Sequence, residues 1–184
     1  MSFVMSRPLI IAIEGNIGAG KSTIIDTLGK QLDGNKEVIL LKEPVDIWES
    51  IKETSTGENI LEKFYKDSAK YAFSFQVMAY VTRLSLLRDT IRNSPECKVI
   101  ICERSLDADR NIFAKMLYDD GLIEDIHYQI YLRFYNEYVK EYRVDGIVYI
   151  DADAEVCYNR IKKRSRDGES NISLDYLEKC KKYY

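Results

Sequence analysis

The sequence predicts an α/β fold in which a parallel β-sheet is flanked by helices, and three observations support this prediction. Short runs rich in Ile and Val alternate with longer stretches of helical periodicity along the chain. A glycine-rich loop joins the first apolar run to the first helix. No repeat or linker divides the 184 residues, so we expect residues 1–184 to form a single domain.

Four short apolar runs are typical of strands that are covered on both faces: residues 9–13, 38–41, 99–101 and 147–150. Each is rich in Ile, Val or Leu and is followed by polar residues. Gly34 and Asn35 supply a turn before the second run. Because helical stretches separate the runs, we expect the four strands to lie parallel in one sheet.

Helical spacing is found over residues 23–32, 68–92, 108–118, 122–142, 154–163 and 173–184. The first stretch places Ile24, Ile25, Leu28 and Leu32 on one face. The long second stretch is stopped by Asn93, Ser94 and Pro95. It is expected to direct these apolar residues inward: Tyr71, Phe75, Met78, Val81 and Leu86.

The composition excludes several classes of protein. Lys and Arg number 27 against 30 Asp and Glu, and this net charge of −3 does not point to a nucleic acid partner. No apolar run approaches the roughly 18 residues of a membrane helix, and the first residues resemble neither a signal nor a transit peptide. We therefore expect a cytoplasmic protein that binds neither nucleic acid nor membrane. The four cysteines, at irregular spacing, suggest neither a zinc site nor a disulfide framework.

The glycine-rich loop matches the phosphate-binding pattern G-x-x-x-x-G-K-[ST] between a strand and a helix. Its residues are Gly15, Asn16, Ile17, Gly18, Ala19, Gly20, Lys21, Ser22 and Thr23. Glycines let backbone N–H groups turn toward phosphate oxygens, Lys21 can reach the terminal phosphates, and Ser22 offers a hydroxyl ligand to Mg²⁺. The alternative is a tight turn with a solvated lysine. The sequence Lys-Ser-Thr directly after the glycines favours nucleotide binding.

Charged residues follow two further strands. Glu43 comes after the second apolar run, and Glu103 and Arg104 come after the third. In a parallel sheet the carboxyl ends of the strands meet at one edge, where ligands bind. We therefore expect these side chains to point toward the phosphate loop, although a capping or solvated Glu43 and a surface ion pair at Glu103 are the plainer interpretations.

Together these residues resemble the deoxynucleoside kinase family. The resemblance rests on the loop, Glu43-Pro44-Val45 with Trp48, Phe75-Gln76, the segment ERSLDADRNIFA from Glu103, and the later basic segment RIKKRSRDGESN. It covers nearly the whole chain, whereas thymidylate kinases share only the loop. It implies a P-loop NTPase-type three-layer fold. Relatives continue to a fifth strand and a last helix, which we expect this chain to lack.

The resemblance implies transfer of the γ-phosphoryl group of ATP to the 5′-hydroxyl of a deoxynucleoside. Glu43 is expected to act as general base, and Arg104 and Lys21 are expected to hold the reacting oxygen and the phosphates. Mg²⁺ would be held by Ser22 and Glu103, directly or through water.

The resemblance also assigns a substrate pocket. Phe75 and Phe113 would stack on the base and Gln76 would bind its edge, beside Trp48. Periodicity alone favours a core position for both phenylalanines. The positions of Ala79, Arg83 and Asp109 match relatives that prefer deoxycytidine and purine deoxynucleosides, although a plain Arg83–Asp109 ion pair is the alternative.

The sugar 3′-hydroxyl is assigned to Tyr65 and Asp175, where most relatives have Glu in place of Asp175; either residue could instead be ordinary polar surface. Arg160, Arg164 and Arg166 resemble the arginines of a lid over the phosphates, at about residues 160–172. A solvated basic face is the alternative, and it is preferred for Lys162 and Lys163. His127 is expected to be structural.

Two other functions stay open at this stage. The chain could be a non-catalytic nucleotide-binding or structural subunit with a kinase fold, or a nucleotide monophosphate kinase, for which no dedicated acceptor phosphate motif is found before the lid. The expected partners are ATP and a deoxynucleoside, and a homodimer is expected through the helices over 68–92 and 122–142.

Overall fold

A computed structural model describes residues 7–164 and 168–184 of the chain. Its sheet contains four strands in the order β2-β3-β1-β4. They are β1 Leu9–Gly15, β2 Val38–Leu41, β3 Val99–Glu103 and β4 Gly146–Ile150. All three pairings are parallel, and Ile10 of β1 lies opposite Ile100 of β3. The predicted parallel α/β fold is therefore confirmed.

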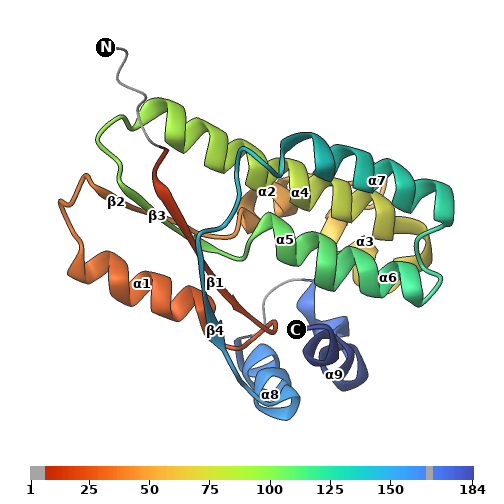
Figure 1. Ribbon diagram of the computed structural model, residues 1–184. Helices are drawn as coiled ribbons and strands as arrows, with labels where there is room; N and C mark the ends of the chain where they lie inside the picture. The colour runs from red at the N-terminus through yellow and green to blue at the C-terminus, as the bar shows by residue number, and fades with distance from the viewer. Residues whose placement is uncertain (1–6, 165–167) are drawn as a thin grey trace.

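Helices cover both faces of the sheet, with α1 on one face and α4 and α7 on the other (Figure 1). The α-helices are α1 Lys21–Gln31, α2 Val45–Ser50, α3 Ile60–Lys66, α4 Ser68–Asn93, α5 Leu106–Ala108, α6 Lys115–Asp119, α7 Asp125–Tyr138, α8 Ala154–Arg164 and α9 Leu174–Tyr183. A π-helix, Asp109–Ala114, separates α5 from α6, and a 3₁₀-helix, Glu169–Asn171, precedes α9. The sequence did not predict α2, α3 or the π-helix.

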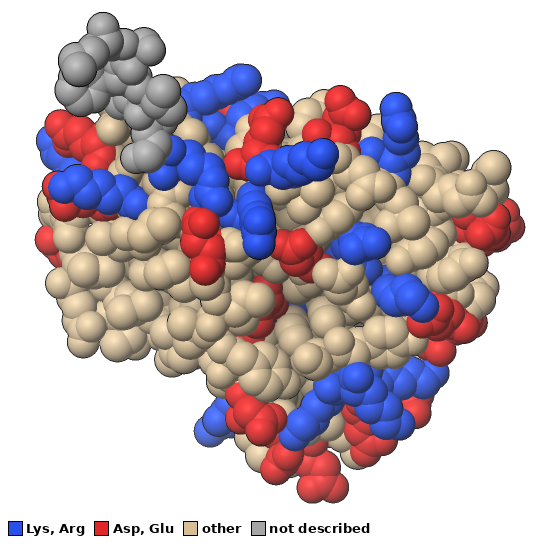
Figure 2. All heavy atoms as spheres, in the orientation of Figure 1, with Lys and Arg blue, Asp and Glu red and all other residues tan. Residues whose placement is uncertain are grey.

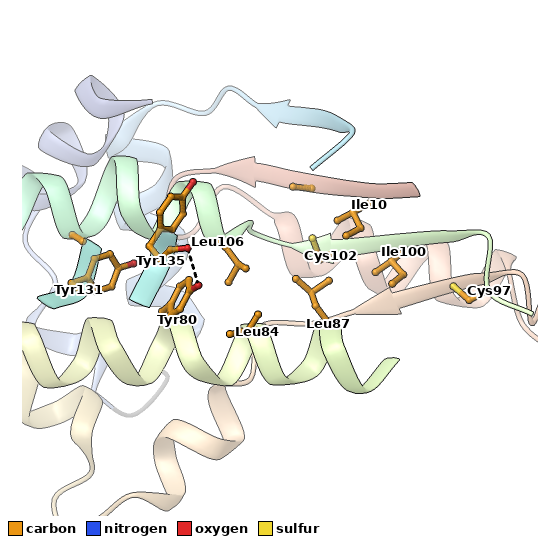
Figure 3. Close-up of a cluster of buried hydrophobic side chains, with 12 residues drawn as sticks. Ile10, Tyr80, Leu84, Leu87, Cys97, Ile100, Cys102, Leu106, Tyr131 and Tyr135 are labelled. Carbon is orange, nitrogen blue, oxygen red and sulfur yellow. Dashed lines mark hydrogen bonds between the residues drawn. The ribbon is translucent and has the colours of Figure 1, made fainter. Parts of the chain in front are cut away.

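The main core lies between the sheet and helices α4 and α7 (Figure 3). Ile10 and Ile100 are completely buried in it. On the helical side, the hydroxyl of Tyr80 donates to the backbone oxygens of Phe134 and Tyr135 at 3.2 and 3.4 Å. Because a buried hydroxyl needs a partner, these bonds fix α7 against α4.

Two expectations about burial are wrong. Strand β4 was expected to be covered on both faces, but Ile147 is 62% exposed because β4 lies at the edge of the sheet and pairs only with β1 among the described strands. Val81 was expected to face inward, yet it is exposed on α4. The inward face of α4 is instead formed by residues such as Tyr80 and Leu84, which pack on the sheet.

Charged side chains of both signs lie on the surface (Figure 2), and the cysteine side chains lie in the interior. Figure 2 shows Lys and Arg side chains intermixed with Asp and Glu over the upper part and the right side of the visible face, whereas the lower left carries few charged side chains. Within the described ranges, no helix has both the length and the apolar character needed to cross a membrane. All four cysteines are free and buried.

Shortening a side chain in the main core tests this packing. Ile100→Ala removes completely buried methyl groups from the centre of the sheet, and we expect it to lower the free energy of unfolding by about 2–5 kcal/mol. Ile147→Ala is the matched control on the exposed edge strand, with an expected loss below about 1 kcal/mol. Urea unfolding followed by circular dichroism measures both. Equal losses would contradict the position of β4 at an open edge.

Candidate active site

A cavity of about 540 Å³ opens at the carboxyl ends of β1, β2 and β3. The chemistry-bearing residues predicted from the sequence converge on it from separate segments of the chain. Those that line it are Ile17, Gly18, Ala19, Gly20, Lys21, Ser22, Thr23, Glu43, Trp48, Tyr65, Phe75, Gln76, Ala79, Arg83, Glu103, Arg104, Asp109, Phe113, Arg160 and Arg164.

The phosphate loop needs glycine where the backbone approaches other segments. Gly15 has a φ of 138°, and a Cβ there would lie 2.7 Å from the carbonyl oxygen of Ile150. A Cβ on Gly18, with a φ of 81°, would lie 2.6 Å from the carbonyl oxygen of Cys157. No side chain caps the N-terminus of α1 at Gly20. The first N–H groups of α1 therefore stay available to an anion in the cavity.

Gly15 and Asn16 form the back of the loop and do not line the cavity. The Asn16 side chain is buried, and its Nδ2 donates to the carbonyl oxygen of Leu177 at 2.8 Å while its Oδ1 accepts from the Ile17 N–H at 2.8 Å. The side chain thus ties the loop to α9 rather than facing a ligand.

Lys21 lies folded into the loop. Its Nζ donates to the carbonyl oxygens of Gly15 and Asn16 at 3.1 and 2.9 Å. Burial, together with the positive charge of Arg104, lowers the pKa of Lys21 to about 7. The neutral amine form of Lys21 is therefore substantially populated near neutral pH, and it gains a proton when negative charge enters the cavity.

Arg83 connects three segments of the site. Its Nη2 donates to Glu43 Oε1 at 2.5 Å, its Nε to Asp109 Oδ2 at 2.8 Å, and its Nη1 to the carbonyl oxygen of Glu103 at 3.1 Å. Burial alone would raise the pKa of Glu43, but the charges of Arg83 and Arg104 outweigh it and hold the pKa at about 2. Burial raises the pKa of Asp109 to about 6, although Arg83 opposes this shift.

Arg104 is buried at the end of β3 and directs its guanidinium into the cavity. Its Nε lies 3.4 Å from Glu43 Oε1, its Cζ lies 4.3 Å from the centre of the Phe113 ring, and its Nη1 donates to the Tyr184 hydroxyl. Its backbone has a φ of 69°, a conformation that costs a non-glycine residue about 1–3 kcal/mol.

Ser22 and Glu103 meet directly. The Ser22 hydroxyl donates to Glu103 Oε1 at 2.8 Å at the mouth of the phosphate loop. A hydroxyl and a carboxylate are hard oxygen donors, which suit Mg²⁺ when phosphate oxygens and water complete its coordination. No group of three or more His, Cys, Asp or Glu side chains able to hold a metal occurs among the described residues. The pair therefore fits a metal that arrives with a phosphate ligand.

Aromatic rings surround one amide at the other end of the cavity. The Phe75 ring stacks on the Phe64 ring, with ring centres 4.6 Å apart. It packs edge to face with the Trp48 ring, with ring centres 5.5 Å apart. Gln76 lies on the next position of α4 and is 2% exposed, and its Oε1 has no hydrogen-bond partner. Ala79, about one turn further along α4, also lines the cavity, and its small side chain takes up little of the cavity volume. A buried acceptor without a partner is costly, so this atom is a marked candidate for ligand binding.

The structure separates the two residues assigned to the sugar. Tyr65 lines the cavity and contacts Tyr176 edge to face, with ring centres 6.1 Å apart. The prediction for Asp175 is contradicted: its side chain is 74% exposed and lies 3.7 Å from Lys179. The physical reason is the rotation of α9, which buries Leu177 and Cys180 and therefore turns Asp175 to solvent while Tyr176 faces the cavity.

Two of the three arginines predicted to form a lid, Arg160 and Arg164, lie on α8 and line the cavity with the phosphate loop. Arg160 Nη1 donates to the carbonyl oxygen of Ala19 at 2.9 Å. Arg164 forms a two-bond ion pair with Glu169, with distances of 2.7 and 2.5 Å. Arg166, the third predicted lid arginine, lies outside the described residues. Elsewhere, the His127 ring stacks on Phe73 with ring centres 4.5 Å apart.

Further lining residues were not predicted: Ile24, Val45, Leu61, Glu169 and Tyr176. Val45 directly follows Glu43-Pro44 in the sequence, so a position near the cavity could have been predicted for it. Tyr176 would have followed from a correct assignment of the buried face of α9. Glu169 carried no local signal, because its place depends on the ion pair with Arg164.

Comparisons with known proteins agree with this geometry. A model of the family described as Deoxynucleoside kinase matches residues 11–184. The chain is 38% identical to a probable deoxycytidine kinase of fowlpox virus, with 91% of this chain and 66% of the relative covered. It is 35% identical to human deoxycytidine kinase, over 92% of this chain and 71% of that protein. It is 30% identical to the mitochondrial deoxyguanosine kinase of Xenopus laevis, over 92% and 69%. The chain thus spans about two thirds of the length of these relatives.

The lowered pKa of Lys21 predicts proton uptake when ATP binds. At pH 8 a lysine with a pKa of about 7 is about nine tenths neutral, and phosphate oxygens beside it will raise its pKa again. We expect uptake of nearly one proton per site, measured by calorimetry in buffers of different ionisation enthalpy. Lys21→Arg is the control, because its guanidinium stays charged and should bind ATP without uptake. Identical heats for the unaltered chain in all buffers would contradict the prediction.

Proposed function

Because this chain belongs to the deoxynucleoside kinase family of ATP-dependent phosphotransferases, we propose that it phosphorylates the 5′-hydroxyl of a deoxynucleoside in nucleotide salvage. One observation carries the proposal beyond the family. The unpartnered Gln76 oxygen lies in the same cavity as the phosphate loop, so a base and a phosphate chain can be bound together. Deoxycytidine and purine deoxynucleosides are the proposed acceptors.

The donor side of the cavity suits the phosphates of ATP. The N-terminus of α1 and Lys21 offer positive potential to the β- and γ-phosphates. Arg160 and Arg164 lie on α8 beside the loop and can close over the phosphates, which keeps water from the reaction. Ser22 and Glu103 would hold Mg²⁺, which when bound neutralises phosphate charge.

The acceptor side suits a flat polar base with a sugar attached. Gln76 can pair with the base edge, while Phe75 and Phe113 supply apolar ring surface. Tyr65 lines the same cavity, and burial raises the pKa of its phenol, so the phenol stays protonated at neutral pH. It can therefore donate a hydrogen bond to the 3′-hydroxyl.

Glu43 is the proposed acceptor of the 5′-hydroxyl proton. With a pKa of about 2 it is ionised at every neutral pH, so the accepting form is always present. Arg104 and Lys21 line the same cavity as Glu43, and their positive charges can stabilise the phosphoryl group in transfer. In phosphoryl transfer, positioning and charge stabilisation contribute more than a strong base does.

The pair Arg83–Asp109 is the proposed source of selectivity for the base. Both side chains line the cavity near Gln76, and their contact at 2.8 Å is buried. Arg83 can donate a hydrogen bond to the base, and Asp109 can accept one from an exocyclic amino group. Cytosine, adenine and guanine carry such an amino group, and thymine does not. The methyl group of thymine can form no hydrogen bond with either side chain of this pair.

An exposed apolar stripe on α7 supports the proposal of a homodimer. Ile126, Ile130, Phe134 and Tyr138 recur every fourth residue and therefore share one helical face. Val81 is exposed on α4, the helix that packs beside α7. A second copy of the chain would cover this surface. The cytoplasmic location and the lack of a nucleic acid or membrane partner stay predictions.

An assay of ATP-dependent phosphorylation tests the function. We expect turnover with deoxycytidine, deoxyadenosine and deoxyguanosine to exceed turnover with thymidine. Glu43→Gln should fold and lose on the order of 10²- to 10⁴-fold in turnover, as removal of a general base does. Asp46→Asn is the control, because it removes an exposed carboxylate three residues away.

The outcomes of this assay separate the alternatives. A preference for thymidine would contradict only the role of Arg83 and Asp109. Near-normal turnover by Glu43→Gln would contradict its role as base. A folded chain that binds ATP and phosphorylates none of the four would instead favour a non-catalytic subunit.

Charge on the α7 stripe tests the dimer. Phe134→Lys places an ammonium group at the centre of the stripe, so we expect sedimentation to show one chain where the unaltered protein shows two. Val156→Lys introduces the same charge at an exposed apolar position of α8 and should leave the dimer intact. A monomeric unaltered protein at micromolar concentration would contradict the proposal.

A further inference from the structure

Arg104 is held in an uncommon backbone conformation at the centre of the site. Among the described residues it is the only non-glycine residue with a positive φ. Such a conformation persists only where the surroundings impose it. Because the φ of Arg104 sets the direction of its side chain, whatever imposes this conformation also aims the guanidinium.

The bonds on either side of Arg104 show what imposes it. The Arg104 N–H continues the β3–β1 ladder and donates to the Ile13 carbonyl oxygen at 3.0 Å. The next N–H, of Ser105, donates instead to Glu14 Oε1 at 2.8 Å, and the Ser105 hydroxyl donates to the same oxygen at 2.6 Å. The Glu14 carboxylate thus takes the place of a backbone carbonyl as the partner of the Ser105 N–H, and the chain turns at Arg104.

The same clamp starts the following helix. The Ser105 hydroxyl accepts from the Ala108 N–H at 3.0 Å and so caps the N-terminus of α5. Ser105 is therefore fixed by Glu14 on one side and by α5 on the other. Arg104 lies between this fixed residue and the sheet ladder.

Glu14 itself does not reach the cavity. Its side chain is 3% exposed and is not among the lining residues. Its second oxygen accepts from the Tyr184 hydroxyl at 3.2 Å. The carboxylate bonds to Ser105 and Tyr184, so Glu14 does not itself contact a ligand in the cavity.

We propose, on the basis of the proposed kinase function, that Glu14 is a positioning residue that clamps Ser105, imposes the left-handed backbone of Arg104 and so directs its guanidinium toward Glu43. Without the clamp, Arg104 relaxes to an ordinary backbone conformation and its guanidinium leaves Glu43 and the Phe113 ring, which it now meets at 3.4 and 4.3 Å. Glu14 carries out no step of the reaction.

A double-mutant cycle on kcat tests whether Glu14 acts through Arg104. Glu14→Ala should lower kcat by on the order of 10²-fold, as misplacement of a reacting group does, with little change in KM for ATP. Glu14→Gln keeps an acceptor oxygen and should recover kcat to within about threefold. In an Arg104→Ala background, Glu14→Ala should cause no further loss. The proposal would be overturned if the loss of kcat in the double variant equalled the product of the losses in the two single variants. An unchanged kcat in Glu14→Ala would also overturn it.

Amide hydrogen exchange of Ser105 provides a readout that is independent of activity. Glu14→Ala should accelerate exchange of this amide, while amides in the middle of α4 keep their protection. A chain without turnover in which Ser105 exchange still responds would refute the kinase function and retain the clamp. Unchanged exchange would refute the clamp.

A second variant covers the case in which Glu14→Ala does not fold. Ser105→Ala removes the hydroxyl contact of 2.6 Å with Glu14 and the 3.0 Å cap of the Ala108 N–H, and it keeps the contact between the Ser105 N–H and Glu14. It should lower kcat several-fold in the unaltered background and leave kcat unchanged in the Arg104→Ala background. An equal loss in both backgrounds would overturn the proposal.

Discussion

The guanidinium of Arg83 is the interaction on which the site depends. It leaves the middle of α4 and bonds to Glu43 after β2, to the backbone of Glu103 at the end of β3, and to Asp109 in the π-helix. Without it, the half-buried carboxylate of Glu43 and the buried carboxylate of Asp109 would repel each other. Removing one partner from such a network usually costs about 3–5 kcal/mol, because the remaining charges stay buried.

This network also explains why the two halves of the cavity form one site. Glu43 bonds to Nη2 of Arg83, Asp109 bonds to its Nε, and all three residues line the same cavity. Arg83 fixes their separation, so under the proposed function the position of a bound base is linked to the position of the hydroxyl that reacts. The π-helix contributes to this link, since Asp109 and Phe113 lie about one turn apart on it and both line the cavity.

Much of the fold and site could be predicted because the relevant signals are local. Apolar runs mark buried strands, and the loop before Lys21 has a fixed spacing that encodes its geometry. Glu43 and Glu103 were placed correctly because parallel strands end at one edge. Helix α3 was not predicted, although its sequence contains a local signal for a helix start, the capping box between Asn59 and Glu62.

What could not be predicted depends on contacts between distant segments. The turn at Arg104 depends on Glu14, a residue 90 positions earlier, and nothing near Arg104 encodes it. The rotation of α9 depends on Leu177 and Cys180 packing against other helices, so Asp175 faces solvent. The exposure of β4 depends on its place at the edge of the sheet, which an apolar run alone does not reveal.

One further consequence concerns Trp48, the single tryptophan of the chain. Its indole N–H donates to the Thr82 hydroxyl at 2.9 Å, and the Arg83 guanidinium lies 5.4 Å from its ring centre. The indole is therefore held rigidly at the wall of the aromatic pocket, next to a charge. Light absorbed at the red edge of the protein spectrum excites this one residue, so its emission reports on the base-binding end of the cavity without any added label.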